Sequence, residues 1–415
     1  MAKKSSVFLR GLLKKVPADW RNSILRERVQ IPTDLPPGVT FKIASTKKEL
    51  EQSFRILHDA YVKVGLMKPH ESGMRVSVYH ALPTSIVLTA QIDGEVVGTV
   101  TVIRESALGL PSEKILDLSP LSKPGLQIAE ISALAIVPKW RGKLFFPLLK
   151  YLYEMCVEVL NIDVFVVSVH SDWYFFYEAL LCFSRIEDRV IDNYAFANNI
   201  PVVGEYLNLK HGYFEYARHY AHLPRDKNLF WYFTQHKIQS FDKRRSRFYS
   251  ICNRAMTFET LNYFFNQRTD VFQALSPSEY WAIKNTYQSK EIDSLLKTPK
   301  EVSQLQVPTS RRYRRLAAYL KAVAVDDNGR QIDITVVEVS RGGMKVYLER
   351  EPEKTTHFLI AKVKLGDFDI PELSLERCWN KESASGLRLT NPNPIWESFI
   401  QYNENLSSDT LANVA

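Results

Sequence analysis

A single acidic residue interrupts the apolar run AEISALAIV, residues 129–137. Burying Glu130 as an ion is costly unless the charge has a partner or a purpose. Desolvation raises the pKa of a carboxylate, which can then exchange a proton near neutral pH. The run therefore predicts a carboxylate that acts as a general base or contacts a substrate. A structural ion pair with Arg55 or Arg104 is the alternative interpretation of Glu130.

A second constellation is RRYRR, residues 311–315, where four arginines fill five positions. Guanidinium groups make bidentate contacts with phosphate or carboxylate and stack on flat rings. Further along, EVSRGG at 338–343 places a small hydroxyl residue and two glycines at an expected turn between strands. Together the two segments predict an anion-binding site.

The elements that must position Glu130 begin with an alternating strand, VTFKIAS, at 39–45. TKKE at 46–49 is a capping box, which predicts the start of a helix. The apolar residues of this helix recur at spacings of three and four; they are Leu50, Phe54, Leu57, Tyr61 and Val64. Two β-branched runs joined by Asp93-Gly94 then predict a hairpin over 85–105.

After the strand that carries Glu130, the chain predicts a helix over 144–160, a buried strand over 163–169 and a short helix over 171–183. Pro147 is tolerable only in the first turn of its helix. The order is strand, helix, hairpin, strand, helix, strand, helix. This order predicts an α/β fold with a sheet of mixed strand direction.

The segment ALAIVPKWRGKLFFPLLKYL resembles the GNAT acyltransferase superfamily, whose helix N-terminus holds the pyrophosphate of coenzyme A. Leu144 and Phe146 stand where that family has glycines, and large side chains there oppose a close phosphate. RILHDAYVKVGLM, GLP at 109–111 and AEISALA at 129–135 resemble the N-acyl amino acid synthase branch, which is related to acyl-homoserine lactone synthases. The resemblance extends over residues 39–210.

That branch takes long acyl chains from acyl carrier protein, an acidic donor that suits a basic surface, with acyl-coenzyme A as the less favoured donor. The resemblance implies a small amine as acceptor and Glu130 as the base. It implies an oxyanion site of backbone N–H groups over Leu134, Ala135, Ile136 and Val137. The alternation of a strand places Glu130, Ser132 and Leu134 on one face.

Further roles follow from the same resemblance. Tyr177, in FYEALLCF, matches a tyrosine that returns a proton to the leaving thiolate, with Cys182 in place of the family's glycine. A packed aromatic side chain with a satisfied hydroxyl is the alternative for Tyr177. Arg55 and Arg104 can hold a substrate carboxylate or serve as structural arginines. His170 is a second candidate proton carrier or a structural histidine.

The chain beyond residue 209 is expected to change character. An aromatic, helical stretch over 210–296 either lines a pocket for a long acyl chain or forms the core of a spacer, which we prefer. KRRSRFY at 243–249 mixes basic and aromatic residues, but no nucleic-acid fold motif accompanies it, and no nucleic-acid partner is expected. A polar linker follows at 297–308.

The C-terminal part, 309–402, predicts a small antiparallel β-barrel with strands near 316–325, 331–340, 343–349, 357–365, 373–380 and 385–389, closed by a helix at 394–402. RxxxR followed by [D/N]xSxxG resembles the PilZ domain, which binds cyclic di-GMP. Arg311, Arg312 and Arg315 lie in the first part, and Glu338, Ser340 and Gly343 in the second, with Glu338 replacing the usual Asp or Asn. The resemblance implies guanine stacking and phosphate contacts by arginine. A barrel without the ligand is the alternative.

The charge of the chain is +8, and residues 1–30 hold eight Lys and Arg against two acids, which gives +6 of that excess. This basic leader, 1–38, is either a loose tail or a peripheral membrane-surface helix. No tightly bound cofactor and no metal site are expected from the scattered histidines and cysteines. Cys156, Cys182, Cys252 and Cys378 are expected to be reduced, buried thiols of a cytoplasmic protein, at the inner membrane face if the leader docks there.

Three functions stay open on this basis. The preferred one is an N-acyltransferase that moves a long acyl chain from acyl carrier protein to an amino acid or similar small amine, under control of cyclic di-GMP. The second is a non-catalytic cyclic di-GMP receptor that uses the GNAT-like fold for interaction. The third is a coenzyme A-dependent N-acetyltransferase. Residues 403–415 are expected to form a tail.

Overall fold

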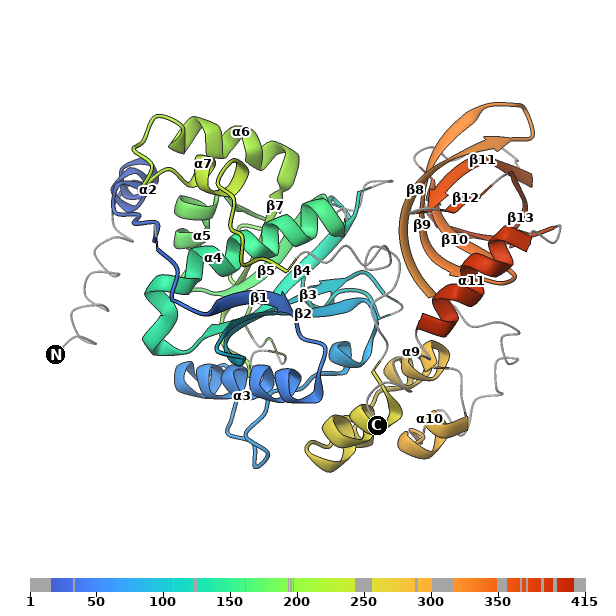
Figure 1. The fold of residues 1–415 in the computed structure, drawn as a ribbon, viewed down its shortest axis with the longest axis horizontal. Coiled ribbons are helices and arrows are strands. Elements are labelled where there is room, and N and C mark those ends of the chain that lie inside the picture. The colour runs from blue at the N-terminus through green and yellow to red at the C-terminus, as the bar shows by residue number, and fades with distance from the viewer. Residues whose placement is uncertain are drawn as a thin grey trace.

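The computed structural model describes residues 16–32, 34–106, 108–121, 126–160, 162–192, 194, 196, 198–242, 256–287, 290–300, 316–348, 357–365, 368–370, 372–381, 384–390 and 394–406. Within these residues the chain forms a mixed α/β unit, a set of helices packed against it, and a C-terminal β-barrel (Figure 1). KRRSRFY lies outside the described residues, as does the leader before residue 16.

The α/β unit is built on a seven-stranded sheet in the order β1-β2-β3-β4-β5-β7-β6. The strands are β1 (Val39–Ile43), β2 (Ser85–Ile92), β3 (Glu95–Arg104), β4 (Ile128–Ile136), β5 (Val164–His170), β6 (Ser184–Arg185) and β7 (Val202–Asn208). Among these strands only β4 and β5 are paired in parallel. The expected α/β class and mixed sheet are confirmed, and β6 and β7 are strands that the sequence patterns did not predict.

The helix α3 (Lys47–Val64) covers one face of the sheet. The predicted capping box is present, since the Thr46 hydroxyl accepts from Glu49 N at 3.2 Å and Glu49 accepts from Thr46 N at 3.1 Å. Leu50, Phe54 and Leu57 are buried against the strands, as their spacing predicts. The hairpin turn also forms as predicted, with Asp93 and Gly94 both at positive φ.

The opposite face is covered by α4 (Arg141–Glu154), which continues into a π-helical turn, Met155–Val159. The helix begins at Arg141, three residues before the predicted start. Pro147 therefore lies in the second turn rather than the first, and the prediction that it belongs to the first turn is wrong. The earlier start leaves Arg141 and Gly142 exposed at the N-terminus of the helix.

The helix α5 (Tyr174–Leu181) follows β5, and Cys182 ends it in the left-handed conformation at φ +56°. This conformation explains why glycine is usual at that position, because only glycine adopts it without steric cost. On the outer side of α5 lies α2 (Ala18–Glu27), whose Leu25 packs with Phe175 and Ala179. This part of the leader is thus a packed helix.

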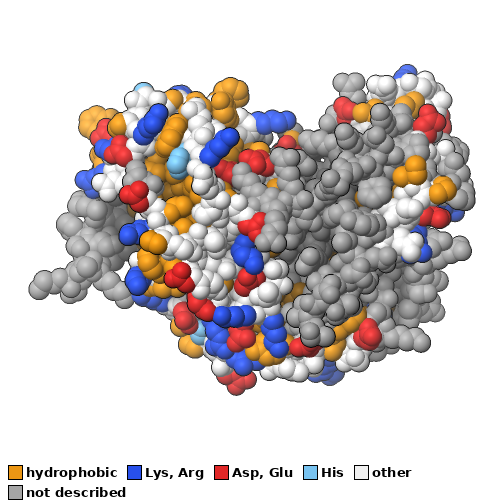
Figure 2. All heavy atoms as spheres, viewed as in Figure 1, with side chains coloured by type: hydrophobic (Ala, Val, Ile, Leu, Met, Phe, Trp, Pro, Cys, Tyr) orange, Lys and Arg blue, Asp and Glu red, His pale blue; other side chains and the backbone are white. Residues whose placement is uncertain are grey.

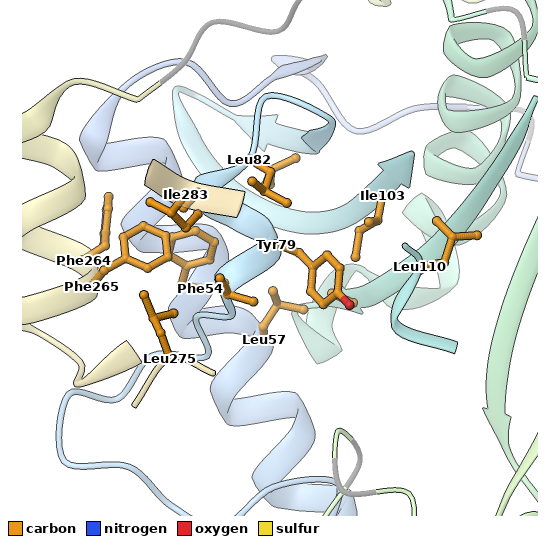
Figure 3. Close-up of a cluster of buried hydrophobic side chains, with 14 of the residues drawn as sticks. Phe54, Leu57, Tyr79, Leu82, Ile103, Leu110, Phe264, Phe265, Leu275 and Ile283 are labelled. Atoms are coloured by element: carbon orange, nitrogen blue, oxygen red, sulfur yellow. The ribbon is translucent and has the colours of Figure 1, made fainter. Parts of the chain in front are cut away.

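Residues 209–296 divide between the two faces of the sheet. The helices α6 (Leu209–Tyr220) and α7 (Leu229–Thr234) lie on the side of α4. On the side of α3 lie α8 (Phe258–Asn262), a π-helical turn (Tyr263–Gln267), α9 (Pro277–Tyr287) and α10 (Lys290–Leu295). Figure 3 shows Phe264, Phe265, Leu275 and Ile283 packed with Phe54. These helices share a hydrophobic core with the sheet and do not stand apart from it.

The C-terminal strands form an antiparallel barrel in the order β12-β11-β13-β14-β10-β9-β8, with β8 also paired to β11. They are β8 (Leu316–Asp326), β9 (Gln331–Ser340), β10 (Gly343–Leu348), β11 (His357–Leu365), β12 (Phe368–Ile370), β13 (Leu373–Lys381) and β14 (Ala384–Leu389). The predicted closing helix is α11 (Pro394–Leu406). Trp396, Phe399 and Ile400 of this helix are buried in the barrel core.

Cysteine placement follows the prediction in part. Cys156 is buried and Cys182 is half-buried, and both are free thiols. Cys378 is also free but exposed, so its predicted burial is wrong; it lies at an irregularity of β13, where the register with β14 shifts and the next residues are exposed too. Cys252 lies outside the described residues. Among the described helices, none has the length and apolar run that crossing a bilayer requires.

Candidate active site

The candidate site lies where two neighbouring strands separate. Ile128–Glu130 of β4 pair with Val164–Val166 of β5, and the two strands are not paired beyond that point. A cavity of about 610 Å³ occupies the gap. Its lining comes from the unpaired ends of both strands and from helices on both faces of the sheet, and it includes Glu130, Ser132, Leu134, Ala135, Ile136, Val167, Ser168, Val169 and His170.

A bulge in β4 shapes one wall of the cavity. Ala133 adopts a left-handed conformation at φ +57°, and the register with β3 shifts between Thr99 and Thr101. The extra residue reverses the alternation, so Ala133 joins the core on the α3 face, whereas Leu134 packs with the core on the α4 face. The prediction that Leu134 shares a face with Glu130 is therefore wrong.

Glu130 is 2% exposed and lines the cavity. Burial raises the pKa of Glu130 to about 7, partly opposed by hydrogen bonding to Ser112 and reinforced by the charge of Glu113. The backbone N–H of Ser112 donates to the carboxylate at 2.8 Å. A carboxylate with this pKa exchanges a proton readily near neutral pH, which suits a general base.

Three tyrosines line the same cavity as Glu130. Tyr61 and Tyr177 line the cavity from α3 and α5, and Tyr194 lines it from the segment before β7. The hydroxyl of Tyr61 accepts the N–H of Ala133 at the bulge. The Tyr194 hydroxyl is buried and has no hydrogen-bond partner among the described residues. Burial raises the pKa of all three, so each keeps its proton at neutral pH.

The structure brings Tyr177 and His170 to the cavity, as the sequence predicts. Tyr177 packs edge-on to Phe183 with ring centroids 5.8 Å apart. His170, at the end of β5, accepts the N–H of Asp172 at 3.0 Å. That hydrogen bond occupies Nδ1, so only Nε2 of His170 is left for another contact.

Arg55 and Arg104 are not among the residues that line the cavity. Arg55 forms an i,i+4 ion pair with Glu51 at 2.7 Å on the surface of α3. Arg104 is fully buried and donates toward the carbonyl oxygens of Pro83 and Thr84. Within the described residues neither arginine forms an ion pair with Glu130. The structural ion pair that was the alternative interpretation of Glu130 is therefore not present there.

Arg75 is an arginine of the cavity that the sequence patterns did not predict. It lines the cavity, stacks over Tyr61 and Phe196 with its guanidinium carbon 4.4 and 5.0 Å from the ring centroids, and donates to the Phe196 carbonyl at 3.0 Å. No carboxylate pairs with Arg75 in the part of the chain that the structure describes. No local signal points to this residue, because residues 66–77 form an irregular connection whose position depends on the tertiary fold.

Some of the predicted oxyanion donors already form hydrogen bonds within the sheet. The N–H of Val137 donates to the Val97 carbonyl at 2.9 Å, so Val137 cannot serve. Successive N–H groups of a strand point to opposite edges, so the N–H of Ile136 points toward the gap between β4 and β5. By the same alternation the N–H of Ala135, which pairs with Thr99, points toward β3, so Leu134 and Ile136 remain as candidates.

The N-terminus of α4 lies at the edge of the cavity, where Arg141 is both exposed and part of the lining. Lys139 and Lys143 are exposed beside it, which makes this edge basic. Leu144 is fully buried, and Phe146 is half-buried against α7 and its neighbours. Both large side chains therefore point into the interior and leave the first turn of α4 open to solvent.

The part of the cavity on the α4 face is apolar. Its lining there includes Phe145, Leu149, Tyr153, Tyr213, Tyr216 and Phe233. The last three come from α6 and α7, so the aromatic stretch does line a pocket, which is the alternative to the spacer that we preferred from the sequence. An apolar wall of this kind suits a hydrocarbon chain.

The barrel motif is described only in part. Arg311, Arg312 and Arg315 lie outside the described residues. Ser340 donates its hydroxyl to the Gly343 carbonyl at 3.2 Å and accepts Trp396 Nε1 on its own carbonyl at 3.0 Å. A Cβ on Gly343, at φ +153°, would overlap the carbonyl oxygen of Leu387. The described contacts of Ser340 and Gly343 are thus contacts that hold the barrel together.

Comparison with known proteins points to one family over part of the chain. Residues 52–208 match the family model described as N-acyl amino acid synthase FeeM. No curated protein matches the chain. Among solved structures, FeeM, an N-acyl amino acid synthase from uncultured soil microbes, is 20% identical with a TM-score of 0.35, covering 42% of this chain and 92% of its own.

Two acyl-homoserine lactone synthases are also similar. The coenzyme A-dependent synthase BjaI, solved with SAM and isopentyl-CoA, is 19% identical with a TM-score of 0.35, covering 41% of this chain and 84% of its own. The synthase LasI is 16% identical with a TM-score of 0.31, covering 40% and 89%. The family match, together with the cavity and its buried carboxylate, identifies residues 52–208 as an N-acyltransferase domain similar to the N-acyl amino acid synthases.

Proposed function

We propose that this enzyme transfers a long acyl chain from acyl carrier protein to the amine of an amino acid or a similar small molecule, and that cyclic di-GMP bound by the barrel controls the transfer. The observation that best supports acyl transfer is the position of Glu130. This buried carboxylate, with a pKa near 7, lines a cavity whose far part is apolar.

The chemistry follows from the residues around the gap. Glu130 takes a proton from the ammonium group of the acceptor, and the free amine attacks the thioester carbonyl carbon. The oxyanion that forms lies at the backbone N–H groups of Leu134 and Ile136. An amide C–N bond forms as the C–S bond breaks. The leaving thiolate takes a proton from Tyr177, which is protonated at neutral pH. The Tyr177 phenolate then takes the second proton of the attacking nitrogen, so the products are an amide and a free thiol, with one proton left on Glu130.

Arg75 fits the acceptor's carboxylate. Its guanidinium is fixed by two aromatic rings and one carbonyl, and it has no carboxylate partner among the described residues. A fixed guanidinium loses little entropy when it binds a planar anion. The hydroxyl of Tyr194, which is buried without a partner in the described chain, is a further contact for the same acceptor.

The identity of the acyl donor is inferred from the residues at the edge of the cavity. Exposed Lys139, Arg141 and Lys143 suit an acidic carrier protein, and the separated strands offer free backbone groups to the amides of a pantetheine arm. Acyl-coenzyme A is the second candidate. It is favoured by one observation, the open first turn of α4, which can hold a phosphate because Leu144 points into the core.

Cyclic di-GMP is proposed as the ligand of the barrel because RxxxR and the turn after β9 occur together with an antiparallel barrel. The arginines would close over the guanine rings and phosphates beside Glu338 and Ser340. Isothermal titration with cyclic di-GMP tests this part. Binding that Arg315→Ala abolishes supports it, with Arg330→Gln at the exposed turn between β8 and β9 as the surface control. Absence of binding by the wild-type protein contradicts it.

Contact with the inner face of a membrane is proposed for the leader. On α2, Trp20 is 73% exposed and Ile24 is exposed on the next turn, and on α6 Phe214 is 68% exposed. Figure 2 shows apolar side chains on this side of the molecule. Exposed aromatic side chains beside basic residues are typical of interfacial helices. Sedimentation with anionic vesicles, compared between wild type and Trp20→Ser, measures this contact.

The enzymatic proposal is tested by mass spectrometry of reactions that contain purified protein, acyl carrier protein or coenzyme A loaded with acyl chains of graded length, and a mixture of amino acids. A new acyl amide that depends on Glu130 names both substrates. If the wild-type protein forms no amide with either donor at any chain length, the proposed reaction is wrong.

A further inference from the structure

Glu130 is held in place by a loop rather than by its own strand. The N–H of Ser112 donates to the Glu130 carboxylate at 2.8 Å, and Ser112 is fully buried. Ser112 belongs to residues 108–116, called here the Ser112 loop. The orientation of the base therefore depends on where this loop lies.

The Ser112 loop is held together by contacts between its own residues. Gly109 is at φ +65°, and the Glu113 carboxylate occupies the space that a Cβ on Gly109 would fill. Glu113 also accepts the N–H of Leu110. Leu116 N donates to the Ser112 carbonyl at 2.9 Å, and the Leu116 side chain packs on Gly204 of β7. These contacts connect both ends of the loop to Ser112, so a displacement of either end would shift the Ser112 N–H.

Both ends of this region are contacted by the C-terminal half of the chain. Lys114 forms an ion pair with Glu279 of α9 at 3.6 Å. Glu105, which follows β3 and precedes the loop, accepts a hydrogen bond from the hydroxyl of Tyr347 in β10 of the barrel. Ser106 joins Glu105 to the loop, because Gly109 N donates to the Ser106 carbonyl at 3.0 Å.

Tyr347 belongs to the hairpin that carries the barrel motif. Gly343 and Tyr347 lie on the same strand, four residues apart, and β10 pairs with β9 from Ser340 onward. Four residues of strand span about 13 Å. A ligand at the turn would therefore act on a strand whose other part touches the acyltransferase domain.

We infer that the barrel positions Glu130 through the Ser112 loop, with the Tyr347–Glu105 hydrogen bond as the point of control. When the bond is made, the loop holds the Ser112 N–H on the Glu130 carboxylate and the base points into the cavity. When it is broken, the loop loosens and transfer slows. This inference rests on the proposed acyl transfer and names the route by which the barrel regulates it.

The test measures hydrogen–deuterium exchange of the full-length protein in peptides that cover residues 108–116 and 128–136. Tyr347→Phe removes only the donor hydroxyl, and Glu105→Met removes the acceptor oxygens at similar side-chain length. We expect both to raise the exchange of these peptides, whereas the control Arg330→Gln, at the exposed turn between β8 and β9, leaves it unchanged. Unchanged exchange in Tyr347→Phe and Glu105→Met overturns the inference.

A kinetic arm separates positioning from binding. Losing a hydrogen bond that orients a charged group lowers the reaction rate by about tenfold. We therefore expect kcat to fall about tenfold in Tyr347→Phe with the KM for the acceptor unchanged. A rise of KM at constant kcat contradicts a positioning role.

The ligand arm uses cyclic di-GMP as the probe. If it binds and changes the exchange of residues 108–116 in the wild type but not in Tyr347→Phe, the signal travels through this contact. An equal change in both proteins refutes the route. If cyclic di-GMP does not bind, the nucleotide part of the proposed function fails, and the exchange of Tyr347→Phe without ligand still decides whether the barrel positions Glu130.

Discussion

Glu130 stands directly opposite Val166 at the last residue pair that joins β4 to β5. This candidate base is therefore the final residue before the two strands separate, and the cavity opens immediately beyond it. Its backbone is held by the sheet while its side chain borders a space large enough for substrates. A carboxylate that is fixed in position and borders a substrate-sized space suits general base catalysis.

The first prediction concerns Glu130 itself. Glu130→Gln keeps the size of the side chain but cannot accept a proton from the ammonium group, so we expect the acylation rate to fall by about 10²- to 10⁴-fold. Steady-state rates with the identified substrates measure this. The control Glu95→Gln, an exposed carboxylate at the far end of β3, keeps full activity.

The pH dependence of the wild type belongs to the same prediction. Because the base works in its ionised form and its pKa is about 7, the rate rises with pH through about 7 and then levels. Glu130→Gln loses this limb and retains a low, flat rate. A wild-type profile that is flat between about pH 6 and 8 would show that Glu130 does not act as the base.

Stability has the opposite pH dependence. The pKa of Glu130 is raised on folding from 4.5 to about 7, so the folded state binds more protons than the unfolded state between these values. Stability therefore falls as pH rises through this window, by an amount on the order of 3 kcal/mol for such a shift. Chemical denaturation at about pH 5 and pH 8 checks this. The wild type is expected to lose more stability than Glu130→Gln between these two conditions.

Arg75 should determine the KM for the acceptor. Arg75→Met removes the guanidinium but keeps an apolar body between Tyr61 and Phe196, so we expect the KM for the acceptor to rise about 10- to 100-fold. Arg55→Met is the matched control, because Arg55 pairs with Glu51 on the surface and is not part of the cavity lining. Equal effects of the two substitutions would assign the carboxylate to another site.

The apolar wall should set the length of the acyl chain. Phe233 lines the cavity from α7 and packs on Tyr216 and Tyr153, with ring centroids 5.6 and 5.9 Å away. Phe233→Ala lengthens the apolar part of the cavity. Each further methylene of the acyl chain that is buried there contributes about 0.8 kcal/mol to the binding free energy of the donor. Competition between acyl donors of graded length should shift toward longer chains. An unchanged length preference would place the acyl chain elsewhere.

Gly343 should be required for the barrel whatever the ligand. Its φ of +153° and the Leu387 carbonyl oxygen, which occupies the position of a Cβ, leave no room for a side chain. Gly343→Ala is therefore expected to destabilise the barrel by about 2–4 kcal/mol. Gly329→Ala is the matched control, because Gly329 has positive φ but no atom within 4 Å of a Cβ. It should cost about 1 kcal/mol. Thermal denaturation compares the two.

Local sequence patterns were enough to predict many of the secondary-structure elements. The capping box at Thr46, the Asp93-Gly94 turn and the alternating strands of the barrel act over a few residues, so their residue types specify the structure directly. Glu130 could be found in the same way, because one charge in an apolar strand is conspicuous wherever that strand lies. The β7 strand was missed because its apolar run VVGEYL follows an irregular segment and becomes a strand by pairing with β5.

Tertiary structure decided which residues meet at the cavity. Arg55 and Arg104 have the chemistry for carboxylate binding, but helix periodicity turns one to the surface and strand burial encloses the other. Arg75 reaches the cavity from an irregular segment, and Tyr213, Tyr216 and Phe233 reach it from beyond the matched segment. The sequence by itself predicted most of the element types, the candidate base Glu130 and the arginine and glycine pattern of the barrel, because these depend on neighbouring residues. Contacts such as Tyr347 with Glu105 join residues far apart in the chain, and only the packing of whole elements brings them together.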